Sequence, residues 1–451
     1  MLKLTDSSSK INTDKILVEA NSISNKLADY PNAVYFLFYF FSTYMVLPFI
    51  EVPFLNISLS APIFFMIFVA CVVKPPTPWF RPFRQWIFLA AFIWIGIFFS
   101  TTFNGVLSFG VDINNKGVAG VIQYAYWLLV FVITTYFASQ GKILLKIAKI
   151  LGFSIFVLAI LRWVEALIFG RIGAWSGTEI MYQNDYGFQF SSFSPFLLIM
   201  IFQQRGWKRF FAILINLVLW GAVAVNGSRG SWVSMVVGLC ITLIMLLVSK
   251  PGKFFGLVII LLIVAGLVIT LGGSFPQISN AVENRLASFE TLDKDKSTLI
   301  RELMIQKGLT LFKESPIIGV GASRFKEEII SLNIPRELSY GSQAYFNRKS
   351  SHNSYIQFLA EFGLIGSIPF ALFIIILLFR SIKPALKSLK LGNMVPAAIL
   401  ISLIQMSIHM WVISSITNSG NWFVYGLVGA QIMNYHKARG VQAIKEAGIK
   451  T

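Results

Sequence analysis

The feature that most constrains this chain is a long series of apolar stretches separated by short polar connections. About 20 apolar residues cross a bilayer as a helix, and within lipid only helices or closed barrels satisfy every backbone polar group. We therefore predict an all-α polytopic membrane protein with about twelve transmembrane helices. The predicted spans lie near residues 33–50, 57–73, 86–103, 119–139, 147–168, 188–203, 210–226, 231–249, 254–272, 353–379, 393–413 and 420–435.

The composition agrees with this class. Hydrophobic residues make up 56% of the 451 positions and charged residues only 13%, which excludes an ordinary soluble domain. Cys71 and Cys240 both fall in apolar segments, so they predict neither a disulfide framework nor a thiolate metal site. The net charge of +18 is divided among short clusters between spans, and this distribution argues against nucleic acid as a partner.

The basic clusters indicate the topology. More than half of the 38 Lys and Arg residues fall in the two tails and in alternate connections, which the positive-inside rule places in the cytoplasm. The clusters in the connections are Lys74/Arg81/Arg84, Lys142/Lys146/Lys149, Arg205/Lys208/Arg209, Lys250/Lys253 and Arg380/Lys383/Lys387/Lys390. We therefore predict a membrane protein with both termini in the cytoplasm.

One long polar interval interrupts the apolar pattern. Residues 273–352 form a large loop that this topology places outside the cytoplasm, and within it Ser297 to Lys313 has the apolar periodicity of a helix. The predicted organisation is a cytoplasmic tail (1–32), transmembrane helices 1–9 (33–272), the large loop (273–352), transmembrane helices 10–12 (353–435) and a second cytoplasmic tail (436–451).

The chain has three histidines, and only His352 lies where the large loop enters the membrane. An imidazole there can accept a proton from a sugar hydroxyl, as a general base must. The alternative is a capping or interfacial histidine. His409 falls within a predicted span and is interpreted as a helix-packing residue, whereas His436 falls in the cytoplasmic tail.

The residues that follow His352 suggest how its helix is packed. On a helix that starts near Asn353, Gly363 and Gly366 share the face of His352, and small residues there would let another helix or a lipid chain approach closely. Glu361 points the opposite way. It is either functional or held by a hydrogen bond between helices.

Four arginines predicted on the outer side are candidates for binding an anion. Arg229 lies in the short turn Asn226–Ser231, and Arg301 lies in the large loop. Arg162 lies at the outer end of the fifth span, and Arg171 follows that span. Arginine binds phosphate in bidentate fashion and stays charged at any working pH, so the group suits a diphosphate at the lipid surface. The alternative is an ion pair or an interfacial charge, for which Arg162 has Glu165 nearby in sequence.

No metal site is predicted. Asp293-Lys294-Asp295 has the spacing of a D-x-D motif, but it lies in a mixed-charge linker and is interpreted as a solvated turn. Gly319-Val320-Gly321 is too short for a phosphate-binding loop and predicts a turn.

At these residues the sequence resembles the O-antigen ligase and polymerase superfamily of bacterial envelope glycosyltransferases. The stretches that carry the resemblance are Asn184-Asp185-Tyr186-Gly187, Gly227-Ser228-Arg229-Gly230, Arg301 with Pro316-Ile317-Ile318-Gly319-Val320-Gly321, and His352-Asn353 followed by Gly363 and Gly366. The last of these looks like the family's H-N-x9-G-x-x-G signature and is the most specific. Asp185 stands where a proline is frequent in the family.

The resemblance implies a GT-C-like, metal-independent glycosyltransferase without a cofactor. Its donor would be a glycan on undecaprenyl diphosphate, and its acceptor a lipid A-core or another glycan, at the periplasmic face of the membrane. His352 would be the base that deprotonates the acceptor hydroxyl, and Arg229 and Arg301 would hold the diphosphate. Arg162 and Arg171 are assigned to the diphosphate by position alone.

Three functions remain open from the sequence. Ligation to a lipid A-core acceptor is favoured because the His352 motif is typical of ligases. Polymerisation of O-antigen or exopolysaccharide repeat units would use the same donor and the same residues. A membrane transporter is the third, disfavoured by the lack of repeated halves and the few acidic residues within spans.

Overall fold

The computed structural model is almost entirely helical. The described residues are 30–48, 51–52, 57–58, 60–74, 81–104, 116–140, 142–169, 181–272, 280, 283, 286–287, 296–328, 351–416 and 418–446. The main elements are α2 (Asn32–Tyr44), β1 (Glu51–Val52), β2 (Ile57–Ser58), α3 (Ser60–Val73), α4 (Arg81–Phe103), α5 (Lys116–Ala138), α6 (Ile143–Phe169), α7 (Gln183–Gln203), α8 (Trp207–Asn226), α9 (Arg229–Ser249), α10 (Pro251–Gly272), α12 (Lys296–Glu314), α13 (Phe325–Glu328), α15 (Ser354–Lys390), α16 (Val395–His409) and α17 (Ser419–Glu446). Strands β1 and β2 form one short antiparallel pair, in which Glu51 faces Ser58.

A helix overlaps each of the twelve ranges predicted to span the membrane. Among the described residues, six helices are long and apolar enough to cross a bilayer, namely α4, α5, α6, α8, α9 and α15. Helices α3 and α16 and the described part of α10 are apolar but shorter. The structure thus confirms the helical, multi-pass character of the chain, while the twelve crossings and the GT-C-like arrangement stay predictions.

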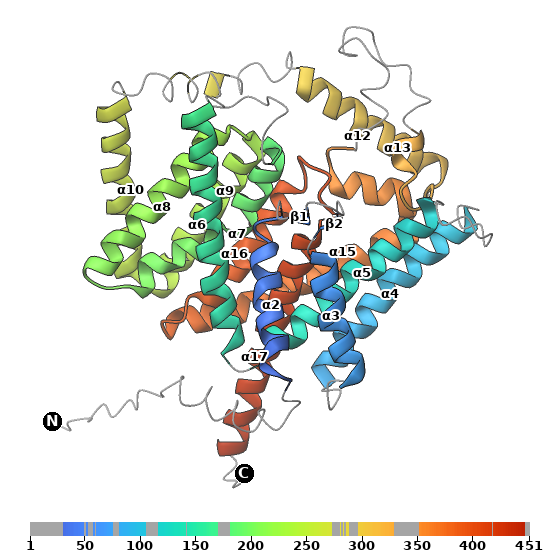
Figure 1. Cartoon of the computed structure of the whole chain (residues 1–451), viewed down its shortest axis with the longest axis horizontal. Helices are drawn as coiled ribbons and strands as arrows, with labels where there is room; N and C mark the ends of the chain where they lie inside the picture. Colours follow the sequence, from blue (N-terminus) through green and yellow to red (C-terminus); the bar gives the residue numbers. More distant parts are fainter. Residues whose placement is uncertain are drawn as a thin grey trace, which may run out of the picture.

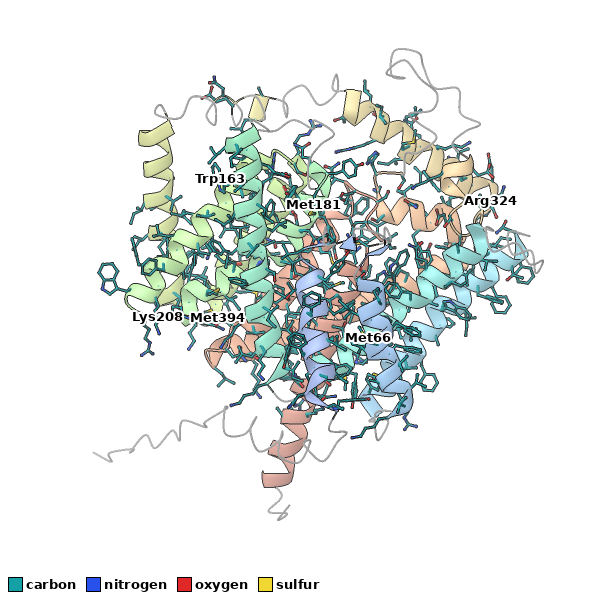
Figure 2. The ribbon with its side chains drawn as sticks, in the orientation of Figure 1. Met66, Trp163, Met181, Lys208, Arg324 and Met394 are labelled. Carbon is teal, nitrogen blue, oxygen red and sulfur yellow. The ribbon has the colours of Figure 1, made fainter. Side chains whose placement is uncertain are left out.

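The helices form a bundle with two different ends (Figure 1). Helices α12 and α13 cover one end, which we call the loop end. Helix α2 begins and α17 ends at the opposite end, which we call the terminal end. Figure 2 shows Lys208 toward the terminal end and Arg324 at the loop end.

Basic side chains at the terminal end bond to helix carbonyls. Lys437 Nζ donates to the carbonyl of Ser139 at 3.1 Å, just after α5 ends, and Lys253 Nζ donates to the carbonyl of Phe202 at 3.2 Å, near the end of α7. The last carbonyls of a helix lack intrahelical partners and carry a partial negative charge, so a nearby ammonium group stabilises them.

The interior is packed by aromatic rings and close helix crossings. Phe373 of α15 stacks on Trp422 of α17 with ring centroids 6.2 Å apart and meets Tyr425 edge-on at 5.3 Å. Helix α5 approaches α17 closely enough for Thr135 Oγ1 to donate to the carbonyl of Gly426 at 3.2 Å. Small residues and hydroxyls of this kind drive helix association where lipid removes the hydrophobic driving force.

The predicted loop helix is present as α12, one residue longer at each end than the predicted range. Its buried face, formed by Ile300, Met304 and Leu311, packs with Phe325 of α13 and Ala360 of α15 in a cluster separate from the main core. These contacts attach the helical part of the large loop to the loop end of α15.

Candidate active site

Arg229 is presented by the tight turn between α8 and α9. Gly227 ends α8 in the left-handed conformation, with φ of 67°, and Ser228 is the N-cap residue of α9. The turn is fixed to the start of α7, since Asn226 Nδ2 donates to the carbonyl of Gln183 at 3.0 Å and Gln183 Nε2 donates to that of Asn226 at 2.6 Å. Arg229 therefore occupies the first position of α9 in a rigid setting.

The start of α9 is suited to an anion. Ser228 makes no side-chain hydrogen bond to the first turn, and that turn contains no acidic residue. Unbonded N–H groups at a helix N-terminus carry a partial positive charge, and Arg229 adds a full one. The combination resembles the helix-terminus sites that bind phosphate groups.

Arg301 is brought toward Arg229 by α12. Arg229 Nη2 donates to Thr298 Oγ1 at 3.4 Å, and Thr298 lies three residues before Arg301 on the same helix. Residues spaced by three lie on one face of a helix. The structure therefore places the two predicted diphosphate arginines at the loop end, around one contact between α9 and α12.

His352 lies just before α15, and its backbone is strained. Its φ of 53° is one of two positive values outside glycine among the described residues. Such a conformation costs a non-glycine residue about 1–3 kcal/mol and tends to occur at functional sites. Because His352 precedes the N-cap residue Asn353, the prediction that it shares a helical face with Gly363 and Gly366 is wrong.

The neighbours of His352 hold this strained backbone in place. Asn353 Oδ1 caps α15 by accepting from the N–H groups of Tyr355 and Ile356 at 3.0 and 3.1 Å. Ser351 Oγ lies 3.0 Å from Ser414 Oγ, and the N–H of Ser354 donates to the carbonyl of Met410 at 2.9 Å. His352 is thereby anchored beside the chain that follows α16.

The same segment connects His352 with Arg229. A Cβ atom on Gly230, the residue after Arg229, would lie 2.3 Å from Val412 Cγ2, so the start of α9 packs directly on residues 409–412. The segment Met410–Ser415, which carries Val412, is also hydrogen-bonded to Ser351 and Ser354. His352 and Arg229 thus flank one short segment at the loop end.

The glycines of two motifs build a second contact, which we call the clasp: residues 316–321 bonded to residues 360–365 of α15. The N–H groups of Val320 and Gly321 donate to the carbonyls of Ala360 and Glu361 at 3.0 and 2.8 Å. In return, the N–H groups of Leu364 and Ile365 donate to the carbonyls of Pro316 and Ile317 at 2.9 and 3.0 Å. The clasp opens the helix, because Gly363 takes a non-helical conformation with φ of 54°.

Only glycine fits at the centre of the clasp. A Cβ atom on Gly363 would lie 2.5 Å from the backbone of Ile317, and one on Gly319 would lie 2.5 Å from the backbone of Glu361. Helix α4 completes the contact, since Ser100 Oγ donates to the carbonyls of Ile318 and Glu361. The predicted close approach at Gly363 therefore involves the large loop, while α4 approaches Gly366 through Gly96.

The buried carboxylate of Glu361 is held by hydrogen bonds. Its carboxylate accepts from Gln357 Nε2 at 3.2 Å and from the N–H groups of Ser323 and Phe325, at the start of α13. Of the two interpretations of this buried acid, the structure supports the hydrogen-bonded one. The carboxylate bonds the loop, however, and not a neighbouring transmembrane helix.

Arg162 is paired inside the bundle. Its Nη1 atom lies 3.2 Å from Glu165 Oε2, and both side chains are buried, at 2% and 1% exposure. Its guanidinium also lies 5.6 Å from the ring of Tyr186, in the first turns of α7. The ion pair with Glu165, which the sequence analysis gave as the alternative for Arg162, is therefore present. Arg171, Asp293 and Asp295 lie outside the described residues.

Asp185 lies in the first turn of α7, before the predicted span of residues 188–203 begins. Burial raises the pKa of its carboxyl from 3.8 to about 6. Within the described part of the chain, no group of three or more His, Cys, Asp or Glu side chains could hold a metal ion.

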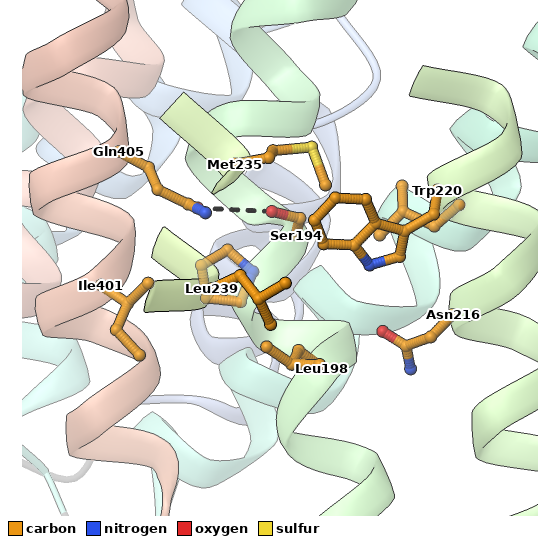
Figure 3. A pocket seen from close by; sticks show the side chains of 10 residues that line it. Ser194, Leu198, Asn216, Trp220, Met235, Leu239, Ile401 and Gln405 are labelled. Carbon is orange, nitrogen blue, oxygen red and sulfur yellow. Dashed lines mark hydrogen bonds between the residues drawn. The ribbon is translucent and has the colours of Figure 1, made fainter. Parts of the chain in front are cut away.

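A small cavity lies away from these groups, between α7, α8, α9 and α16, where Ser194 and Gln405 face each other (Figure 3). Ser194 Oγ donates to Gln405 Oε1 at 3.3 Å, and the other lining residues are mostly apolar. No residue predicted to bind or catalyse lines this cavity.

Comparison with known proteins identifies the segment that carries these groups. A family model described as O-Antigen ligase matches residues 213–371, from α8 to the first turns of α15 beyond the clasp. The matched segment contains Arg229, Arg301 and His352, whereas Arg162 and the stretch Asn184–Gly187 precede it. A comparison with curated proteins finds no match. Residues 213–371 of this chain are thus similar to the O-antigen ligase family.

Proposed function

We propose that the protein is an O-antigen ligase-type glycosyltransferase. It moves a glycan from undecaprenyl diphosphate to a lipid A-core acceptor, or a related one, at the periplasmic face of the bacterial inner membrane. The proposal rests on two contacts at the loop end. The residues on either side of His352 and the start of α9 both lie against the segment 409–415, and Arg229 bonds to Thr298 on the helix that bears Arg301. The family match to residues 213–371 supports the same class of reaction.

The reaction is an in-line displacement at the anomeric carbon of the donor sugar. The acceptor hydroxyl oxygen forms the new bond to that carbon, and its proton passes to His352. The bond between the anomeric carbon and the diphosphate oxygen breaks, and its electron pair leaves with the diphosphate. Attack from the opposite side inverts the anomeric centre.

The arginines supply what this leaving group needs. Negative charge grows on the diphosphate as the bond breaks, and cationic groups held in place before the reaction stabilise it without reorganising. Arg229 is fixed at the start of α9, and Arg301 is carried by α12. These fixed charges let the reaction proceed without a divalent ion in the proposed mechanism.

The remaining arginines have smaller roles in this proposal. The charge of Arg162 is balanced by Glu165 in a buried pair, so we assign Arg162 to holding Tyr186 and the start of α7. Arg171 is retained as a diphosphate ligand on the basis of its sequence position alone.

The test uses purified protein with a defined lipid-linked donor and a lipid A-core acceptor. The His352→Ala variant should lose about 10²–10⁴-fold in transfer rate, the usual contribution of a general base, while still binding the donor. His436→Ala is the matched control, because His436 lies in the second half of α17, which ends at the terminal end of the bundle. This variant should transfer the glycan at the normal rate. Near-normal turnover by His352→Ala would contradict the assignment.

Mass analysis of the products separates the two members of the superfamily. A ligase transfers the glycan to the lipid A-core acceptor, whereas a polymerase lengthens the lipid-linked chain even when that acceptor is omitted. Uptake of a glycan into proteoliposomes without any new glycosidic bond would instead support the transporter.

A further inference from the structure

His409 ends α16 at the loop end, directly behind the proposed diphosphate site. Its side chain is 1% exposed and lies between the first turns of α7 and α9. Cβ atoms on Gly187 and Gly230 would come within 3.3 and 3.4 Å of its Nε2 atom. Gly187, of the stretch Asn184–Gly187, and Gly230, of the stretch Gly227–Gly230, thus leave space for this imidazole. His409 itself lies outside the segment matched by the family model.

The His409 imidazole is a buried polar group whose hydrogen bonds are not satisfied within the described residues. Among the described residues, neither Nδ1 nor Nε2 of His409 has a hydrogen-bond partner. A neutral imidazole carries one donor and one acceptor, and native proteins seldom leave such groups buried and unsatisfied. If the side chain served only to fill space, a phenylalanine would do so without the free-energy cost of burying two unsatisfied ring nitrogens.

The groups around His409 favour an anion as the missing partner. Arg301 interacts with His409 electrostatically, and Arg229 immediately precedes Gly230. Ser228 Oγ would lie 2.7 Å from the same Cβ position on Gly187 that approaches Nε2. The starts of α7 and α9 both have no side-chain cap. The first turn of α7 carries Asp185 whereas that of α9 has no acidic residue, so it is the N-terminus of α9 that adds partial positive charge here.

We propose that His409 is a third binding residue for the leaving diphosphate, to which its ring N–H donates a hydrogen bond. This inference rests on the proposed function, because it takes the diphosphate site at Arg229 and Arg301 as given. His352 then serves the acceptor, and His409 serves the departing group. The two histidines act on opposite sides of the bond that breaks.

Two substitutions separate hydrogen bonding from packing. His409→Phe keeps the ring and its contact with Phe188, whose centroid lies 6.0 Å from that of His409, but removes both nitrogens. His409→Gln keeps a donor near the position of Nε2. With farnesyl diphosphate as probe and detergent-purified protein, His409→Phe should bind at least about tenfold more weakly, and His409→Gln should stay within about threefold of the wild type.

The kinetic readout should show the same division. His409→Phe should lower kcat more than it changes KM for the acceptor, because the lost contact strengthens as the diphosphate departs. Equal probe affinity and equal kcat in His409→Phe and the wild type would overturn the proposal and leave His409 as a packing residue. Failure of the wild type itself to bind the probe would count against the proposed function as well.

A second measurement needs no substitution of His409 itself. The chain has only three histidines, so ring ¹⁵N labelling gives a spectrum that His352→Ala and His436→Ala variants can assign. Addition of farnesyl diphosphate should shift the ¹⁵N signals of His409. Shifts in His352 alone, with the His409 signals unchanged in a probe-bound sample, would contradict the inference.

Discussion

At the scale of single residues, the proposed site concentrates positive charge at places where the backbone already favours an anion. Arg229 is the first residue of α9, so its guanidinium adds to the partial charge of an uncapped helix N-terminus. Its Nη2 atom already reaches Thr298 on α12. The position therefore uses the shape of the arginine side chain as well as its charge.

Replacement of Arg229 by lysine tests the value of that shape. Lysine keeps the charge but cannot bind two phosphate oxygens with a planar fork. Arg229→Lys should lower kcat/KM for the lipid-linked donor by about tenfold or more, while Arg209→Lys, at an exposed position in the first turn of α8, should leave it unchanged. Equal steady-state kinetics for both variants would show that only charge matters at residue 229.

The buried carboxyl of Asp185 predicts a pH-dependent stability. Its pKa is raised from 3.8 to about 6 in the folded chain, so the folded state holds its proton more tightly than the unfolded state. The resulting destabilisation is absent below about pH 4, develops as the pH rises through 6, and is complete above it. Asp185→Asn should therefore stabilise the protein at pH 7.5 by on the order of 1 kcal/mol but not at pH 4.

Thermal unfolding in detergent across this pH range checks the prediction. Glu314→Gln is the control, since Glu314 is an exposed acid at the end of α12, and it should show no such trend. A stability difference for Asp185→Asn that does not change between pH 4 and 7.5 would contradict the assigned cause.

Some of these residue features follow from sequence and others do not. His352 and Arg229 stand out because their residue types are rare at those positions and the motifs around them are specific. The strained backbone of His352 could not be predicted, because it depends on hydrogen bonds from Ser351 and Ser354 to residues about 60 positions later. The sequence predicts only a packing role for His409, because it does not show that the ring nitrogens have no hydrogen-bond partner among the described residues.

At the scale of elements, the clasp decides where α12 lies. It joins the end of the large loop to the break in α15 through four backbone hydrogen bonds, and Ser100 adds α4 to the same point. Because the clasp starts just after α12 ends, it limits how far Arg301 can move from the start of α9. The glycines of two separate motifs are explained together by this one contact.

Substitution of Gly363 should break the clasp. An alanine there would need a left-handed backbone and would place its Cβ atom 2.5 Å from the backbone of Ile317. Each effect costs about 1–2 kcal/mol or more, so Gly363→Ala should lower the unfolding temperature and abolish most transfer activity. Gly256→Ala on α10, where a Cβ atom meets nothing within 4 Å, should do neither. An active, stable Gly363→Ala variant would remove the clasp from the mechanism.

The sequence predicted the elements well and their contacts poorly. A helix overlaps every apolar stretch read as a span, because each stretch carries its own signal of length and hydrophobicity. The range Ser297–Lys313 likewise has a local apolar periodicity and matches α12. The clasp has no local signal, since it pairs the backbone of residues 316–321 with that of residues about 44 positions away, and the backbone is the same for every sequence.

At the scale of the whole molecule, charge and chemistry separate between the two ends of the bundle. The proposed catalytic groups gather at the loop end, while Lys253 and Lys437 bond to helix carbonyls at the terminal end. From the positive-inside rule we propose that the terminal end faces the cytoplasm. A donor lipid diphosphate would then meet its acceptor on the other side of the membrane, where the acceptor glycan is assembled onto the cell envelope.

This orientation predicts which residues a membrane-impermeant maleimide can reach in intact cells. Single cysteines are introduced in a Cys71→Ala, Cys240→Ala background at Glu314, exposed at the loop end, or at Lys208, exposed in the first turn of α8. Glu314→Cys should be labelled in cells whose outer membrane alone is permeabilised, and Lys208→Cys only after the inner membrane is opened. The reverse pattern would place His352, Arg229 and Arg301 in the cytoplasm, where a periplasmic transfer reaction could not use them.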